Sequence, residues 1–146
     1  MRKIALFLVI SILAAGCQKE IKASDLAKIN GYWEIEKVIS SDGSKKEYTI
    51  NDTFDYFELK NNSGFRKKVS PQLDGTFLVN DAYEMVKIQN QNGKYFLQYH
   101  TSFSKWKEEL LVISDQELVT INDSKNEYHY KRAAPINILG NGQKTQ

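Results

Sequence analysis

The sequence predicts an all-β domain whose strands follow one another as an antiparallel up-and-down meander. Aromatic and β-branched runs recur between short groups of Asn, Asp, Gly and Ser, and no stretch after residue 31 keeps a helical period. Apolar and polar side chains also alternate along several of these runs. About eight or nine such strands can close into a barrel, which removes unpaired edges; a two-sheet sandwich is the alternative architecture.

The composition is that of one small folded domain. The chain has 146 residues, with 20 Lys and Arg against 18 Asp and Glu. Arg2 and Lys3 are the only charged residues among the first 16, so the remainder is neutral by formal count. A neutral chain does not favour nucleic acid as a partner, and a single Cys allows no internal disulfide.

The first residues have the pattern of a bacterial export signal. Arg2 and Lys3 precede an uncharged run, residues 4–15, whose length suits a signal-peptide core and is short for a membrane span. The next residues, Leu13-Ala14-Ala15-Gly16-Cys17, resemble the lipobox of bacterial lipoproteins. An ordinary secretory signal followed by an incidental Cys is the alternative.

The lipobox resemblance implies that residues 1–16 are removed and that Cys17 receives acyl chains such as palmitate, with 17–23 as a lipidated tether. Two or three acyl chains anchor a protein firmly in a membrane. Lys19 and Glu20 resemble, in part, the export signal of surface lipoproteins in Bacteroidota. We therefore expect an outer-membrane lipoprotein of a Gram-negative bacterium; Lys19 and Glu20 favour display on the surface, and a periplasmic orientation is the alternative.

A short helix is expected over residues 24–29. Ser24 is a suitable N-cap, Asp25 suits the positive end of the helix, and Asn30-Gly31 can end it. The expected strands after it are Tyr32–Ser40, Thr53–Lys60, Phe65–Ser70, Thr76–Asn80, Tyr83–Gln89, Lys94–Thr101, Lys105–Ile113, Glu117–Ile121 and Glu127–Arg132, with Glu47–Ile50 as a further short candidate. Residues 133–146 are expected to be a polar C-terminal tail.

Alternation along the strands suggests which side chains face the interior. Tyr95 and Tyr99 share one face of their strand, and Tyr128 and Tyr130 share one face of theirs. These four tyrosines would line an aromatic interior with hydroxyl groups, as small-molecule pockets often have. The alternative is that they fill a small core without a ligand cavity.

Gly31-Tyr32-Trp33 resembles the Gly-x-Trp motif that opens the first strand of lipocalins, and it likewise follows a short helix. The segments 110–119 and 127–132 resemble the closing hairpins of small, Bacteroidota-type lipocalin-like lipoproteins. The resemblance covers residues 24–132 and implies a lipocalin-like barrel domain. It also implies that Arg132 packs across Trp33 as a structural closure, and that a small apolar ligand binds inside.

Patterns for catalysis and metal binding are not found in the sequence. The two histidines, His100 and His129, fall on expected solvent faces, and no Cys-x-x-Cys or His-x-His spacing occurs. Glu108 and Glu109 are adjacent on a strand, so they point to opposite faces and cannot act as a pair. We expect no catalytic residues, no metal and no cofactor, and we do not expect an enzyme.

Two further features have alternative interpretations. The basic run Arg66-Lys67-Lys68 is interpreted as protection of an edge strand against aggregation, and contact with an anionic surface is the alternative. Trp106, between two lysines, is either a wall residue of the barrel or an exposed anchor for a partner.

The leading functional hypothesis is a lipid-anchored envelope protein that binds or carries a small hydrophobic molecule without catalysis. The alternative is a protein-interaction module, such as an accessory subunit, inhibitor or immunity protein, whose barrel is packed and whose partner is an envelope protein. An exposed apolar patch around Trp106 and Phe103 would favour the alternative.

Overall fold

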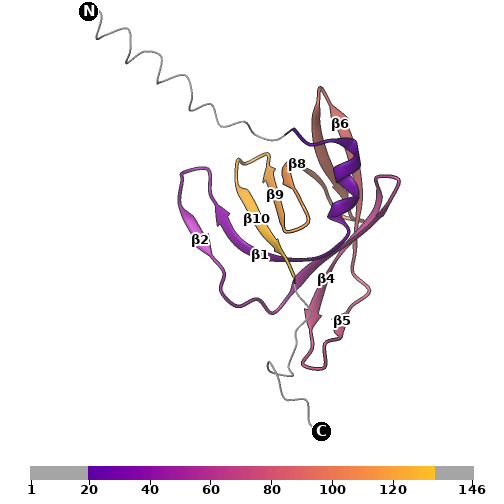
Figure 1. The fold of residues 1–146 in the computed structure, drawn as a ribbon, viewed down its shortest axis with the longest axis vertical. Helices are drawn as coiled ribbons and strands as arrows, with labels where there is room; N and C mark the ends of the chain where they lie inside the picture. Colours follow the sequence, from indigo (N-terminus) through magenta and orange to yellow (C-terminus); the bar gives the residue numbers. More distant parts are fainter. Residues whose placement is uncertain (1–19, 134–146) are drawn as a thin grey trace, which may run out of the picture.

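The computed structural model describes residues 20–133, which form ten β-strands and one short 3-10 helix (Figure 1). The helix is η1 (Ala23–Ile29), and the strands are β1 (Gly31–Ile39), β2 (Lys45–Glu47), β3 (Phe54–Lys60), β4 (Ser63–Pro71), β5 (Phe77–Val79), β6 (Glu84–Gln91), β7 (Lys94–His100), β8 (Lys105–Ile113), β9 (Glu117–Asn122) and β10 (Glu127–Arg132). The expected signal segment, Cys17 and the tail after residue 133 lie outside the described residues. Within residues 20–133, no helix has the length and hydropathy of a membrane span.

Eight of the strands form a closed antiparallel barrel. The hydrogen-bonded order is β10-β9-β8-β7-β6-β4-β3-β1, and β10 pairs with β1 to complete the ring. The short strands β2 and β5 lie outside this ring and pair with β1 and β4. The all-β meander and its closure into a barrel, both expected from the sequence, are confirmed.

All of these strand pairs join residues between 31 and 132, so the barrel is complete without residues 1–17. Residues 18–146 therefore contain the whole barrel. This fragment is the one that suits denaturation and binding experiments.

The second strand differs from its expected position. A strand was expected at Glu47–Ile50, whereas β2 covers Lys45–Glu47. The hairpin turn is the reason, because the Gly43 N–H donates to the Ser40 carbonyl and Gly43 has a φ of 84°. This tight turn places Lys45 directly opposite Ile39, so pairing starts two residues earlier.

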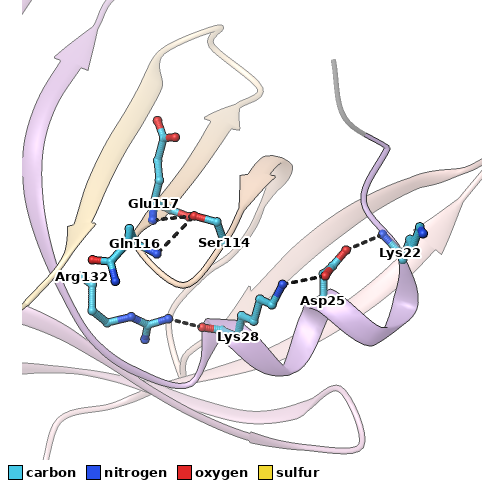
Figure 2. Close-up of polar contacts among 7 residues, drawn as sticks. All are labelled: Lys22, Asp25, Lys28, Ser114, Gln116, Glu117 and Arg132. Atoms are coloured by element: carbon cyan, nitrogen blue, oxygen red, sulfur yellow. Dashed lines mark hydrogen bonds and ion pairs between the residues drawn. The ribbon is translucent and has the colours of Figure 1, made fainter. Parts of the chain in front are cut away.

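The N-terminal helix is present, but Ser24 is not its N-cap. The helix starts at Ala23, and the backbone N–H of Lys22 donates to the Asp25 carboxylate at 3.1 Å. Lys28 also donates to Asp25, at 2.8 Å, so one carboxylate joins both ends of this short helix (Figure 2). Leu26 and Ile29 are buried and cover one end of the barrel.

The interior is filled by side chains that alternate with solvent-facing ones, as expected for barrel strands. Six strands, β1, β3, β6, β7, β8 and β9, supply apolar core side chains, among them Trp33, Phe57, Val86, Ile88, Leu97, Leu110 and Leu118. Trp33, Leu97 and Leu118 have no measurable exposure to solvent. A second, outer cluster of rings covers β3 and β4, with Tyr32 stacked on Phe77 at 4.1 Å between centroids.

Arg132 and Trp33 close the end of the barrel at which η1 lies. The Arg132 guanidinium carbon is 3.8 Å from the centre of the Trp33 ring, and the Trp33 indole donates to the Ile29 carbonyl at 2.7 Å. Arg132 also donates to the Lys28 carbonyl at 2.6 Å (Figure 2). It donates to the Asn30 carbonyl at 2.7 Å as well. These contacts fix the helix end against both the first and the last strand.

Gly31 is required in this closure. Its φ of 111° is a conformation that residues with a Cβ rarely adopt, and a Cβ there would lie 2.9 Å from an Arg132 guanidinium nitrogen. The turn between β8 and β9 completes the same end, because Arg132 also donates to the Asp115 carbonyl at 3.0 Å. Ser114 holds this turn by accepting the backbone N–H groups of Gln116 and Glu117 (Figure 2).

Replacing Arg132 by Ala should lower the free energy of unfolding of residues 18–146 by about 3 kcal/mol. The change removes three hydrogen bonds from a charged donor and the contact with the indole. Urea denaturation would measure the loss. Lys131→Ala is the matched control, since Lys131 is exposed and has only a 3.4 Å surface ion pair, which contributes about 0.5 kcal/mol. Equal losses in the two variants would contradict the closure.

A candidate ligand site at the open end of the barrel

The two ends of the barrel differ. The helix η1 and the short turns around residues 61–62, 91–93 and 114–116 share one end, as the alternating strand directions require. The longer connections around 40–44, 72–76, 101–104 and 123–126 share the other end, which we call the open end. Inward-facing side chains near these longer loops are therefore the ones closest to solvent at this end of the barrel.

Arg66 lies inside the barrel, which corrects the interpretation of the basic run. Its strand, β4, is not an edge, because it pairs with β3 on one side and with β5 and β6 on the other. The Arg66 guanidinium lies over the Tyr99 ring, with its carbon 4.3 Å from the ring centre, and pairs closely with Glu84. Along this run, the side chains of Arg66 and Lys68 therefore point to the inner face of the barrel, and the side chain of Lys67 points to the outer face.

Asp55 is the buried carboxylate next to Arg66. It is 2% exposed, and its Oδ1 lies 2.7 Å from the Lys68 ammonium and 3.8 Å from Arg66 Nε. Lys68 reaches Asp55 from the open end, where more than half of the lysine side chain is in solvent. These contacts compensate the Asp55 charge, which would otherwise be costly in the interior.

Glu108 is a second buried carboxylate, on the facing wall of the barrel. It is 8% exposed, and its Oε2 accepts from the Thr120 hydroxyl at 2.9 Å and from the Tyr99 hydroxyl at 3.4 Å. Burial raises the pKa of Glu108, while attraction to Arg66 and the two hydrogen bonds oppose the rise. Glu109 faces outward and pairs with Lys94 at 2.8 Å, so the opposite faces expected for the two glutamates are confirmed.

Two cavities open between these groups and the loops of the open end. The first, here called the Arg66 cavity, has a volume of about 250 Å³. It is lined by Arg66, Lys68, Asn80, Ala82, Tyr83, Glu84 and Thr101. The second, the Trp106 cavity, has a volume of about 300 Å³. It is lined by Trp106, Lys107, Glu108, Asn122, Asp123, Ser124 and Tyr128.

Trp106 is a wall residue of the barrel, which decides between its two interpretations. Its indole stacks on the Tyr99 ring at 5.1 Å and 12°, and the side chain is half-buried. Tyr128 lines the same cavity, and its hydroxyl accepts from the Asn122 amide at 3.1 Å. The exposed aromatic side chain of this region is instead Phe103, which is 96% exposed in the loop between β7 and β8.

The four tyrosines expected to contact a ligand lie in different places. Tyr99 and Tyr130 are almost completely buried, and burial raises the pKa of both hydroxyls well above the usual value. Tyr128 lines the Trp106 cavity, whereas Tyr95 packs on the core near the turn at 91–93, at the closed end. Ligand contact by these residues stays a prediction, and Tyr128 is the one whose position fits it at the open end.

A larger groove of about 630 Å³ lies on the outside of the barrel. Strand register puts Ser63, Lys87, Gln98 and Lys107 in one row on the outward face, and Met85, His100 and Lys105 in the next. Because lysines at a solvent-facing groove are usually hydrated, this groove is a weaker candidate than the inward-facing cavities. Among residues 20–133, no three His, Cys, Asp or Glu side chains converge as metal ligands.

Comparison with known proteins gives one structural likeness. No protein-family model matches the sequence, and no curated protein matches it. A crystal structure of a lipocalin-like protein from Bacteroides uniformis is similar to this chain, with a TM-score of 0.47, 10% identity, and coverage of 73% of this chain and 99% of that one. The chain's own strand order, its closure and its N-terminal helix define the architecture. The fold is a closed eight-stranded antiparallel barrel preceded by a short helix, as the sequence predicts.

The stability of Glu108→Gln relative to the unchanged chain should depend on pH. Because the folded state raises the pKa of Glu108 above its unfolded value, the folded chain holds this proton more tightly, and its stability falls as the pH rises through the folded pKa. Gln cannot ionise, so the variant should gain stability relative to the unchanged chain between pH 4 and pH 7. Urea denaturation at the two pH values measures this gain. Glu109→Gln should show no gain, and a pH-independent difference for Glu108→Gln would contradict the prediction.

Proposed function

We propose that this chain is a lipid-anchored protein of the bacterial envelope that binds a small, largely hydrophobic molecule at the open end of its barrel, without catalysis. The observation that carries the binding proposal is the Trp106 cavity, whose lining places two aromatic side chains, Trp106 and Tyr128, beside five polar or charged ones. Aromatic surface next to polar groups that can orient a ligand is a feature of small-molecule sites.

The walls of this cavity are held in place before any ligand arrives. The Trp106 indole is fixed by its stack on Tyr99, and Tyr99 lies in turn against the Arg66 guanidinium. Rigid aromatic walls reduce the entropy lost when a ligand binds. A ligand at this position therefore gains contact area without ordering the barrel.

The ligand would bind at the mouth rather than at the centre of the barrel. Below the mouth, the interior is occupied by Arg66, Tyr99 and Tyr130, and deeper still by the apolar core. An eight-stranded barrel is just wide enough for its own side chains and at most one small ligand. A cavity of about 300 Å³ suits a molecule with one or two rings.

The proposed anchor is compatible with an accessible mouth. The lipid on Cys17 would join the barrel through the residues before η1, and η1 lies at the closed end. Residues 18–22 can span at most about 17 Å when extended. The anchor would thus hold the closed end near the outer membrane and leave the open end free, on whichever side of the membrane the protein is displayed.

A second candidate function, a protein-interaction module, is favoured by the apolar side chains exposed around the open end. Within residues 20–133, the large apolar side chains most exposed to solvent are Ile50, Leu73, Leu78, Val79, Tyr83, Met85 and Phe103. Leu73 and Phe103 lie in open-end loops, and Leu78 and Val79 lie in β5. Tyr83 and Met85 lie at the entry to β6, and Ile50 lies in the connection from β2 to β3. An envelope protein covering this end would bury them.

Binding at the mouth can be tested with 1-naphthylamine, a two-ring fluorescent probe that is uncharged at neutral pH. The probe should bind residues 18–146 saturably, and Trp106→Ala should weaken binding about tenfold, because the ligand loses an aromatic contact of about 1.4 kcal/mol. Phe103→Ser is the control, since Phe103 lies outside the cavity, and it should leave binding unchanged. Unaltered binding by Trp106→Ala would contradict a site in the Trp106 cavity.

The anchoring part of the proposal can be tested with Cys17→Ala in the full-length chain. The variant should move from the membrane pellet to the soluble fraction and should lose incorporation of labelled palmitate, since the thiol that takes the lipid is absent. The unchanged chain, fractionated in parallel after a salt wash, is the control. A variant that still sediments with salt-washed membranes would be evidence against a lipid anchor at Cys17.

A further inference from the structure

One oxygen of Glu108 has no partner. Both hydrogen bonds that this carboxylate accepts, from Thr120 and Tyr99, fall on Oε2. Within residues 20–133, Oε1 accepts no hydrogen bond from the protein and is not fully buried, and Glu108 is a lining residue of the Trp106 cavity. A side chain more than nine-tenths buried therefore presents an open acceptor to the space in which we place the ligand.

The cations near Glu108 are committed elsewhere. Arg66 pairs with Glu84 and Asp55, and Lys68 pairs with Asp55. Arg66 attracts Glu108 across the barrel, but the two form no ion pair within 4 Å. When all are ionised, three carboxylates face two cations inside the open end, which leaves one negative charge uncompensated, and Glu108 is the carboxylate without an ion pair.

Lys107 lines the same cavity but does not neutralise it. The Lys107 side chain points to the outer face of β8, where its ammonium lies over the Phe96 ring, 5.2 Å from the ring centre. Asp123, at the rim of the cavity, adds a second carboxylate. The field inside the cavity is therefore negative, and it disfavours an anionic ligand.

The aromatic walls favour a cation for a separate reason. The faces of Trp and Tyr rings carry partial negative charge, and they attract ammonium groups most strongly where water is excluded. Trp106 from β8 and Tyr128 from β10 supply such rings in the lining of the cavity that Glu108 also lines. A neutral ligand would use the apolar surface but would leave Glu108 Oε1 unpaired.

We propose that the small molecule bound in the Trp106 cavity is a cationic amine, whose ammonium donates to Glu108 Oε1 while its apolar body lies against Trp106 and Tyr128. This inference rests on the proposed function and names the chemical class of its ligand. The volume of about 300 Å³ suits an amine with a single aromatic ring and a short chain.

Three probes that share one aromatic body test the inference: 2-phenylethylamine, 2-phenylethanol and 3-phenylpropanoate. Calorimetric titration into residues 18–146 at pH 7.5 should show the amine binding about tenfold tighter than the alcohol, because only the amine makes a charge-assisted hydrogen bond. The carboxylate should bind weakest. Glu108→Gln should remove the advantage of the amine over the alcohol, whereas Glu109→Gln, a carboxylate one residue away on the outer face, should keep it.

The outcomes separate this inference from the proposed function. If the alcohol binds as tightly as the amine to the unchanged chain, the cavity is a ligand site but amines are not its ligand class. This comparison uses the unchanged chain alone, so it does not depend on the folding of a variant. If the amine is preferred equally by the unchanged chain and by Glu108→Gln, the role of Glu108 is overturned. If no probe binds, including the uncharged naphthylamine, the ligand site and the inference are both overturned.

Discussion

The contact between the Arg132 guanidinium and the Trp33 indole is the interaction on which the closed barrel depends. It joins the last residue of the last strand to the first strand, and it lies where the meander must meet itself. The same guanidinium satisfies the carbonyls of Lys28 and Asn30, at the end of a helix too short to satisfy its own. The same side chain therefore closes the barrel and holds the helix against it. A planar guanidinium with several N–H donors suits these combined contacts better than the ammonium of a lysine does.

This arrangement divides the interior into an apolar and a polar half. Trp33 and the apolar side chains of η1 take the closed end, so the buried charged groups lie toward the open end, where Lys68 and Glu84 still reach solvent. A buried Arg66 carries a desolvation cost that its carboxylate partners and the Tyr99 ring offset. The polar layer fills the middle of the barrel and confines any ligand to the mouth.

Much of the fold could be predicted because alternation and turn residues act locally. The strand order, the hairpins and the place of Arg132 follow from residues close in sequence or from the motif at Gly31. The position of Arg66 could not be predicted, since its neighbours two residues away, Gly64 and Lys68, give no apolar signal. The apolar residues of this strand, Phe65 and Val69, face outward under the outer cluster of rings, which reverses the usual pattern.

The candidate site was accessible to sequence reasoning only in part, for the same reason. The sequence places Glu108 on the face shared with Trp106 and Leu110, two residues to either side, which is an inward signal. It does not specify which groups approach from β4, β7 and β9, and these decide whether a carboxylate is paired. The tyrosines illustrate the limit, because two of the four fill the core rather than a ligand cavity.

Glu108 and Glu109 show how strand geometry gives identical neighbours different roles. Glu109 faces solvent beside Lys94 and needs no further explanation. Glu108 is held inside the barrel at the cost of desolvation, and its Oε1 accepts no hydrogen bond from the described protein. A Gln or Leu at this position would avoid that cost, since a buried carboxylate without a committed cation weakens a fold. Natural proteins keep such local conflicts mainly where they serve a function. The conflict at Glu108, rather than the size of any cavity, is therefore the strongest indication that the open end binds a ligand.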